Sequence, residues 1–187
     1  MGYERVENVV ILITGASHTG KTMLAYRLIE KYKYPCLSID HLKMGLIRSG
    51  NTSLTTEDDD ELVGYLWPIT CEIIKTSIEN KQNMIVEGGY IPFDWRQDFD
   101  KQYLQAIRFI CLAMSDEYIN GHFCDIIKYG CEVEARLDNS CFTIDQARKE
   151  NRQMIEGYLK SGEHITLIES NYEKSIYGLS NGYFGRQ

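Results

Sequence analysis

Long apolar runs are missing from this sequence. No stretch approaches the roughly 20 apolar residues that a membrane-spanning helix needs. The first ten residues carry Glu4 and Glu7 and lack the basic start and cleavage site of a signal peptide. These absences argue against an integral membrane protein or a secreted protein. We therefore expect a cytoplasmic protein with no membrane partner.

Positive charge is also in short supply. The 20 Lys and Arg residues are outnumbered by 27 Asp and Glu residues, which gives a formal net charge of −7. A protein that coats nucleic acid needs a basic face, so we expect a small-molecule partner and no nucleic acid. The sequence leaves open whether the chain forms a homodimer.

Paired cysteines are absent as well. None of the six cysteines belongs to a CxxC pair. Cys124, Cys131 and Cys141 lie within one segment, but their spacing does not match that of paired zinc ligands. We therefore predict reduced cysteines and no structural zinc.

Apolar segments alternate with amphipathic ones along the chain. Val9–Ile13 is continuously apolar and β-branched, as expected for a central parallel strand. Further strands are predicted at residues 35–39, 84–86, 106–112 and 164–168, and helices at 20–32, 42–47 and 57–81, the last kinked at Pro68. This alternation predicts an α/β fold with a mostly parallel sheet, in a single domain over residues 1–187.

The residues that follow the first strand match the phosphate-binding pattern GxxxxGK[ST] in full. They are Gly15, Ala16, Ser17, His18, Thr19, Gly20, Lys21 and Thr22, with Met23 next in the helix. The glycines let successive N–H groups face phosphate oxygens, Lys21 reaches the β- and γ-phosphates, and the Thr22 hydroxyl binds magnesium. The sequence therefore predicts a nucleotide site for ATP and Mg²⁺. His18 is unusual in such a loop, and we expect it to point outward or to contact phosphate or acceptor.

Asp40 is expected at the end of the second strand, beside the phosphate loop. A carboxylate there can orient an attacking hydroxyl or accept its proton, although an N-cap for the next helix is the alternative. Lys43 and Arg48 follow within two turns, as anion-binding residues or as solvated surface charges.

Glu87 ends the third strand and is expected to hold the magnesium ion, directly or through water, unless it only closes a turn. Gly88 and Gly89 are expected to let a ligand approach the backbone closely. Acceptor-side helices are expected over about residues 41–80.

About fifty residues separate the fourth and fifth strands, far more than a single crossover helix requires. We expect a lid over about residues 115–160. Arg148 and Arg152 lie four residues apart on a predicted helix and so share a face that suits phosphate oxygens. Helix-surface pairing with Asp145 or Glu156 is the alternative.

Together these residues resemble the P-loop small-molecule kinases, the group that includes adenylate, gluconate and shikimate kinases and chloramphenicol phosphotransferase. The strings Leu37–Lys43 and Ile85–Tyr90 look closest to 2-phosphoglycerate-kinase-like and zeta-toxin-like bacterial ATP-binding proteins. The resemblance implies a three-layer fold with sheet order 2-3-1-4-5 and a helical lid. It also implies that Asp40 binds the acceptor hydroxyl, and that Arg148 or Arg152 stabilises the transferred charge.

These observations favour an ATP-dependent phosphotransferase that acts on a small hydroxyl-bearing or phosphorylated metabolite. A nucleotide-dependent regulatory ATPase is the alternative from another class, and a nucleoside monophosphate kinase differs only in its acceptor. A GTPase switch is disfavoured because the guanine-reading NKxD string is missing.

Overall fold

The computed structural model describes residues 8–133 and 142–182, and the strands within them form one parallel sheet. The strands are β1 (Val10–Gly15), β2 (Cys36–Ser38), β3 (Met84–Glu87), β4 (Ile107–Met114) and β5 (Ile165–Ile168). They pair in the order β2-β3-β1-β4-β5. The predicted fold class and strand order are therefore confirmed. All five strands were predicted to within two residues at each end.

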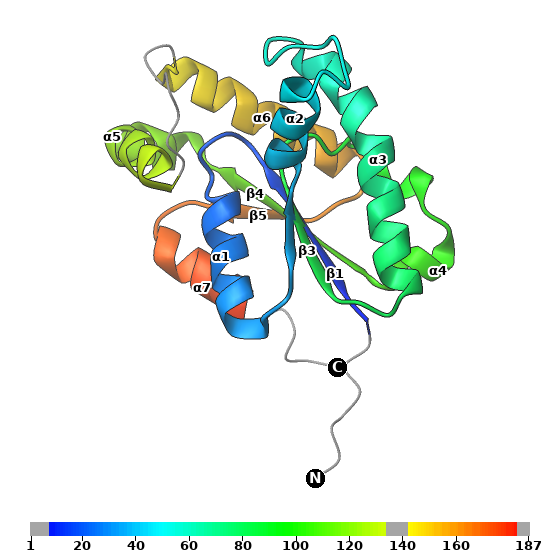
Figure 1. Ribbon diagram of the computed structural model, residues 1–187. Helices are drawn as coiled ribbons and strands as arrows, with labels where there is room; N and C mark the ends of the chain where they lie inside the picture. The colour runs from blue at the N-terminus through cyan, green and yellow to red at the C-terminus, as the bar shows by residue number, and fades with distance from the viewer. Residues whose placement is uncertain (1–7, 134–141, 183–187) are drawn as a thin grey trace.

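Strand β1 is the centre of the molecule, and its six residues are all buried. One face of the sheet packs on α1 (Lys21–Tyr32) and α7 (Tyr172–Gly182). The other packs on α3 (Asp59–Glu79), the 3-10 helix η1 (Trp95–Asp98) and α6 (Ile144–Lys160), with α4 (Lys101–Leu104) at its border. Figure 1 shows the resulting three layers. The apolar run of β1 is thus explained by helices on both of its faces.

Two helix starts differ from the prediction. Helix α2 (Ile39–Arg48) begins directly after β2, so Asp40 lies in the first turn of a helix and not at the end of a strand. Helix α3 begins at Asp59 and not near Glu57, because the Asp58 carboxylate accepts hydrogen bonds from the N–H and hydroxyl of Thr55 and so closes a turn before the helix. Pro68 lies inside α3, which continues past it, and the kink expected there stays a prediction.

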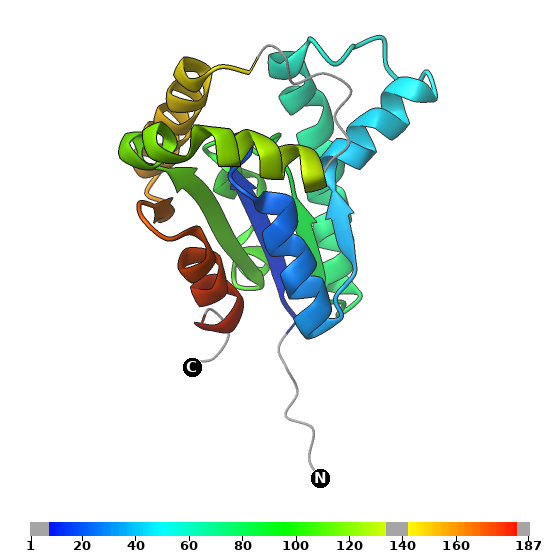
Figure 2. The same cartoon turned by 90° about the vertical axis from the view of Figure 1, so that its left-hand side faces the viewer.

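The segment expected as a lid contains α5 (Asp116–Val133) and α6. Helix α5 is kinked at His122, and Figure 2 shows it lying across the top of α1. Helix α6 begins after a capping box on Thr143. Its later turns are part of the core, since Tyr158 is fully buried and donates a hydrogen bond to the carbonyl of Ile91. Of the described residues in this segment, those of α5 and the first turns of α6 therefore lie at the phosphate-loop end.

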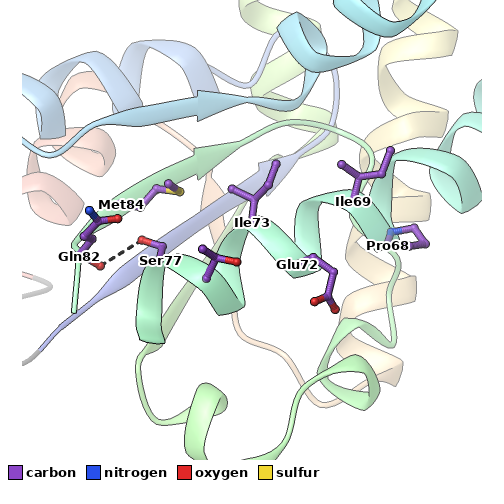
Figure 3. A pocket seen from close by; sticks show the side chains of 8 residues that line it. Pro68, Ile69, Glu72, Ile73, Ser77, Gln82 and Met84 are labelled. Atoms are coloured by element: carbon purple, nitrogen blue, oxygen red, sulfur yellow. Dashed lines mark hydrogen bonds between the residues drawn. The ribbon is translucent and has the colours of Figure 1, made fainter. Parts of the chain in front are cut away.

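A groove of about 640 Å³ runs along the outer face of α3 (Figure 3). It is lined by Pro68, Ile69, Glu72, Ile73, Thr76, Ser77, Gln82 and Met84. Because Met84 begins β3, this groove lies at the amino end of the sheet, opposite the phosphate loop. Within the described part of the chain, no helix combines the length and apolarity that a bilayer crossing requires.

Candidate nucleotide and acceptor site

The loop between β1 and α1 needs glycine at two positions. Gly15 has φ +149°, and a Cβ there would lie 2.2 Å from the carbonyl oxygen of Leu112 in β4. Gly20 has φ +89°, and a Cβ there would lie 1.7 Å from the Tyr172 hydroxyl at the start of α7. Both glycines therefore let the loop curl against neighbouring elements, in a conformation that other residues rarely adopt. Burial raises the pKa of Tyr172 to about 12.

Two polar side chains of the loop form hydrogen bonds with the loop's own backbone. Thr19 is fully buried, and its hydroxyl donates to the carbonyl of Ala16 at 2.8 Å. Lys21 Nζ donates to the same carbonyl at 2.9 Å, so the ammonium lies over the loop. These bonds fix the loop before any phosphate arrives.

The Thr22 hydroxyl donates to Glu87 Oε2 at 3.3 Å, which joins the loop to the end of β3. The structure thus brings together the two residues predicted to hold magnesium. Glu87 is only 3% exposed, and a buried carboxylate of this kind needs a cation or hydrogen-bond donors. Among the residues that the structure describes, no group of three or more His, Cys, Asp or Glu side chains forms a separate metal site.

Asp40 belongs to a chain of polar contacts on the acceptor side. Its Oδ1 lies 3.0 Å from Lys43 Nζ, which donates to the Tyr90 hydroxyl at 2.7 Å. That hydroxyl donates to Asp59 Oδ1 at 2.8 Å, at the start of α3. Burial lowers the pKa of Lys43, but the bonds to Tyr90 and Asp40 outweigh it, so the net shift is upward. Burial raises the pKa of Tyr90 to about 12.

The two other residues predicted on the acceptor side lie differently. Gly88 is buried, and a Cβ there would lie 2.7 Å from Cβ of Ile39. Its missing side chain therefore makes room for α2, whereas the neighbouring Gly89 is exposed with open space beside it. Arg48 is exposed in the last turn of α2.

The lid arginines share a face, as predicted, but that face is turned toward α5. Arg148 donates to Asn120 and, at 3.2 Å, to Asp145. Arg152 donates to Asp116, with its Nε at 3.1 Å. In this arrangement both guanidiniums are engaged by side chains of the lid itself.

The α6 residue that contacts the phosphate loop is an acid. Glu150 Oε2 accepts a hydrogen bond from the N–H of Ser17 at 3.3 Å. Asn151, next along the helix, is buried, accepts from the N–H of Met114 at 2.7 Å and donates to the carbonyl of Ala147. Packing of Asn151 against the end of β4 thus sets the rotation of α6. We missed Glu150 because its face of the helix carries no sequence signal.

His18 has φ +61° and packs against α5 and the residue Phe142. Its ring centroid lies 4.6 Å from that of Phe142, and a Cβ on Gly130 of α5 would meet its Nδ1 at 2.0 Å. The outward orientation we considered is therefore wrong for this arrangement, because α5 covers the loop at this point. Contact of His18 with phosphate or acceptor stays a prediction.

Comparison with known proteins supports the architecture. No protein-family model matches the chain, and no curated protein matches its sequence. Among solved structures, the chain is similar to deoxyadenosine kinase from M. mycoides with bound dATP (13% identity, TM-score 0.56, covering 94% of this chain and 99% of that one). It is also similar to shikimate kinase from Bacteroides thetaiotaomicron (14% identity, TM-score 0.53, covering 91% and 96%). The fold is that of the P-loop kinases. At these identities the likeness extends to the fold alone.

Proposed function

We propose that this protein is an ATP-dependent phosphotransferase that moves the γ-phosphate of Mg-ATP to a small hydroxyl-bearing or phosphorylated metabolite. The observation that carries the proposal is the contact between Thr22 and Glu87 at the end of a complete phosphate loop. A hydroxyl and a carboxylate in that position suit a magnesium ion that retains some of its water. The P-loop kinase fold agrees with this reading.

The residues present fit the triphosphate and its metal. The loop N–H groups and the amino end of α1 attract phosphate oxygens, and Lys21 is already folded over the loop. Magnesium, when bound, neutralises charge on the phosphates. Because phosphoryl transfer asks for positioning and charge stabilisation more than covalent chemistry, these groups supply most of what the reaction needs.

Asp40 is proposed to orient the acceptor hydroxyl and to take its proton. Its neighbour Ile39 packs on Gly88, which follows Glu87, so Asp40 lies on the same edge of the sheet as the proposed metal site. Its side chain is 38% exposed and therefore accessible to a ligand. The lid arginines would have to leave their partners on α5 to reach the transferred phosphate.

The test is ADP release from Mg-ATP across a panel of acceptors, with Lys21→Ala as the inactive control. We expect one acceptor class to raise the rate well above background. Asp40→Asn should lower kcat by about 10²–10⁴-fold and change the Kd for ATP far less. Equal losses in both would remove Asp40 from the acceptor role.

A nucleotide-dependent regulatory ATPase is the second candidate, and the contact between Glu150 and Ser17 favours it. Nucleotide entry would disturb that contact and so shift α6, as a sensor requires. A slow hydrolysis rate that no acceptor stimulates, together with tight ATP binding, would support this candidate. A nucleoside monophosphate kinase, or the 2-phosphoglycerate-kinase-like activity that the Leu37–Lys43 string suggests, would each appear as stimulation by that acceptor.

A further inference from the structure

Two cations near the acceptor side, Lys43 and Arg96, already have partners within the protein. Lys43, 13% exposed, lies between Asp40 and the hydroxyl of Tyr90, with its ammonium also 4.7 Å from the Tyr90 ring centroid. Arg96, which follows the loop after β3, forms a two-pronged ion pair with the buried Glu163, with its Nη2 at 3.0 Å. An anionic acceptor would have to compete with Asp40 for Lys43 and with Glu163 for Arg96.

Carboxylates, in contrast, are in excess. Residues 39–61, which span α2 and the first turn of α3, carry six Asp or Glu residues and two Lys or Arg residues. Hydrogen bonds from the backbone and side chain of Thr55 lower the pKa of Asp58 and so favour its charged form. Asp59 accepts the Tyr90 hydroxyl. The field on this side of the site therefore attracts positive charge.

The excess of acid continues into a cavity of about 1000 Å³ that begins at Asp60, next to Asp59. The cavity lies between the start of α3, the loop and 3-10 helix after β3, and the later turns of α6. Its lining carries four carboxylates and two cations, and Arg96 is one of those two, already paired with Glu163. Asp60 and Asp94 are both exposed at its surface.

An aromatic ring completes the cavity. Phe93 is 41% exposed, and its ring is held edge-on against Tyr158, 4.8 Å between centroids. A Cβ on Gly157 would lie 2.5 Å from that ring, so the absence of a side chain at Gly157 leaves room for Phe93. A fixed ring beside carboxylates suits an ammonium group, which is attracted both to the face of the ring and to the acids.

We propose that the acceptor is a polyhydroxylated compound with one or more amino groups, and that its ammonium lies in the cavity bounded by Asp60, Phe93 and Asp94. This proposal rests on the proposed phosphotransferase function and narrows its acceptor. The hydroxyl to be phosphorylated points toward Asp40, while the amine lies on the side of Asp60. Carboxylated and phosphorylated acceptors are disfavoured by the same charges.

The experiment uses sets of related acceptors that differ chiefly in the charge of one or two substituents. One set is glucosamine, glucose and glucuronate, and a second is 2-deoxystreptamine, inositol and an inositol phosphate. ADP release is measured for each compound at low and high salt. We expect the amine of a set to exceed its acid by at least about tenfold in kcat/KM, with a difference that shrinks as salt screens the charges. A higher kcat/KM for the acid would overturn the proposal.

Two variants locate the effect. Asp60→Asn and Asp94→Asn should each raise the KM for the amine by about two- to fivefold, and leave the KM for the uncharged compound of the set unchanged. Glu30→Gln, which removes an exposed charge near the far end of α1, is the matched control and should alter neither. Equal effects on amine and uncharged acceptor would show a structural role only and would overturn the assignment.

Failure of the phosphotransferase function would be recognised separately. If no compound of any charge stimulates ADP release, binding of kanamycin, a polyhydroxylated compound with several amines, is measured directly by calorimetry. Binding that weakens in the Asp60→Asn/Asp94→Asn double variant would support the ammonium site and reject the transfer function. Absence of binding, or binding that the double variant leaves unchanged, would overturn the site as well.

Discussion

The contact between Glu150 and the phosphate loop predicts that this carboxylate limits nucleotide affinity. Its Oε2 accepts from the N–H of Ser17, so a negative charge lies against the loop that we propose binds a triphosphate. Two unit charges about 6 Å apart repel by about 3 kcal/mol at an effective dielectric constant of about 20. Solvent and salt reduce this at a partly exposed site, and we take about 1–2 kcal/mol as the net effect.

The variant Glu150→Gln removes the charge and keeps the shape and an oxygen that can still accept from Ser17. The Kd for Mg-bound non-hydrolysable ATP should therefore fall by about 5- to 30-fold. Isothermal titration calorimetry at fixed ionic strength measures this directly. Glu30→Gln is the control for loss of one acid from the protein.

The same reasoning sets the salt dependence. Raising the salt concentration should weaken the advantage of Glu150→Gln over the native protein, because the repulsion that it removes is electrostatic. An unchanged or weaker affinity in Glu150→Gln would refute the reasoning. It would mean that the carboxylate supports the loop conformation that binds phosphate and does not compete with the ligand.

Three further predictions follow from single contacts. Gly20→Ala should lower the free energy of unfolding by about 1–3 kcal/mol and weaken nucleotide binding, because its Cβ would overlap the Tyr172 hydroxyl. Chemical denaturation and calorimetry measure the two effects, and a variant as stable as the native protein would disprove the overlap. Burial raises the pKa of Tyr172 to about 12, so its contribution to the free energy of unfolding is complete below pH 10 and is lost between about pH 10 and 12, by at most about 3 kcal/mol. Tyr172→Phe should therefore flatten the dependence of stability on pH in that window. An unchanged slope would contradict the assignment. Asn151→Leu should lower the free energy of unfolding by about 2–4 kcal/mol, because it leaves the buried N–H of Met114 unpaired. Equilibrium urea unfolding tests this, and a loss below about 0.5 kcal/mol would argue against Asn151 as a stabilising partner of Met114.

The parts of the site that lie close together in sequence could be predicted from the sequence. The phosphate loop is eight consecutive residues between an apolar strand and an amphipathic helix, so its geometry follows from local backbone requirements. Glu87 was placed correctly beside Thr22 because Glu87 ends β3 and Thr22 follows the neighbouring parallel strand β1, at the same edge of the sheet. Asp40 was placed at the correct edge, although it belongs to α2 and not to β2.

Residues far apart in sequence were beyond prediction from pattern alone. Helical spacing predicted that Arg148 and Arg152 share a face, but not which neighbour that face meets. The answer depends on the burial of Asn151 and Tyr158, which rotates Glu150 toward the loop and both arginines toward α5. The bond between Lys43 and Tyr90 likewise joins elements that only the folded chain brings together.

The sequence by itself determined the α/β class, the phosphate loop and the acid beside it, because each depends on the backbone conformation of adjacent residues or on the order of strands. Tertiary structure decided which charged side chains lie at the candidate site. Gly20 meets Tyr172 from the other end of the chain, and Glu150 reaches Ser17 across 133 positions. Such contacts arise from the packing of whole helices against the sheet. The burial of a few apolar and amide side chains fixes the rotation of a helix, and with it the directions in which its remaining side chains point.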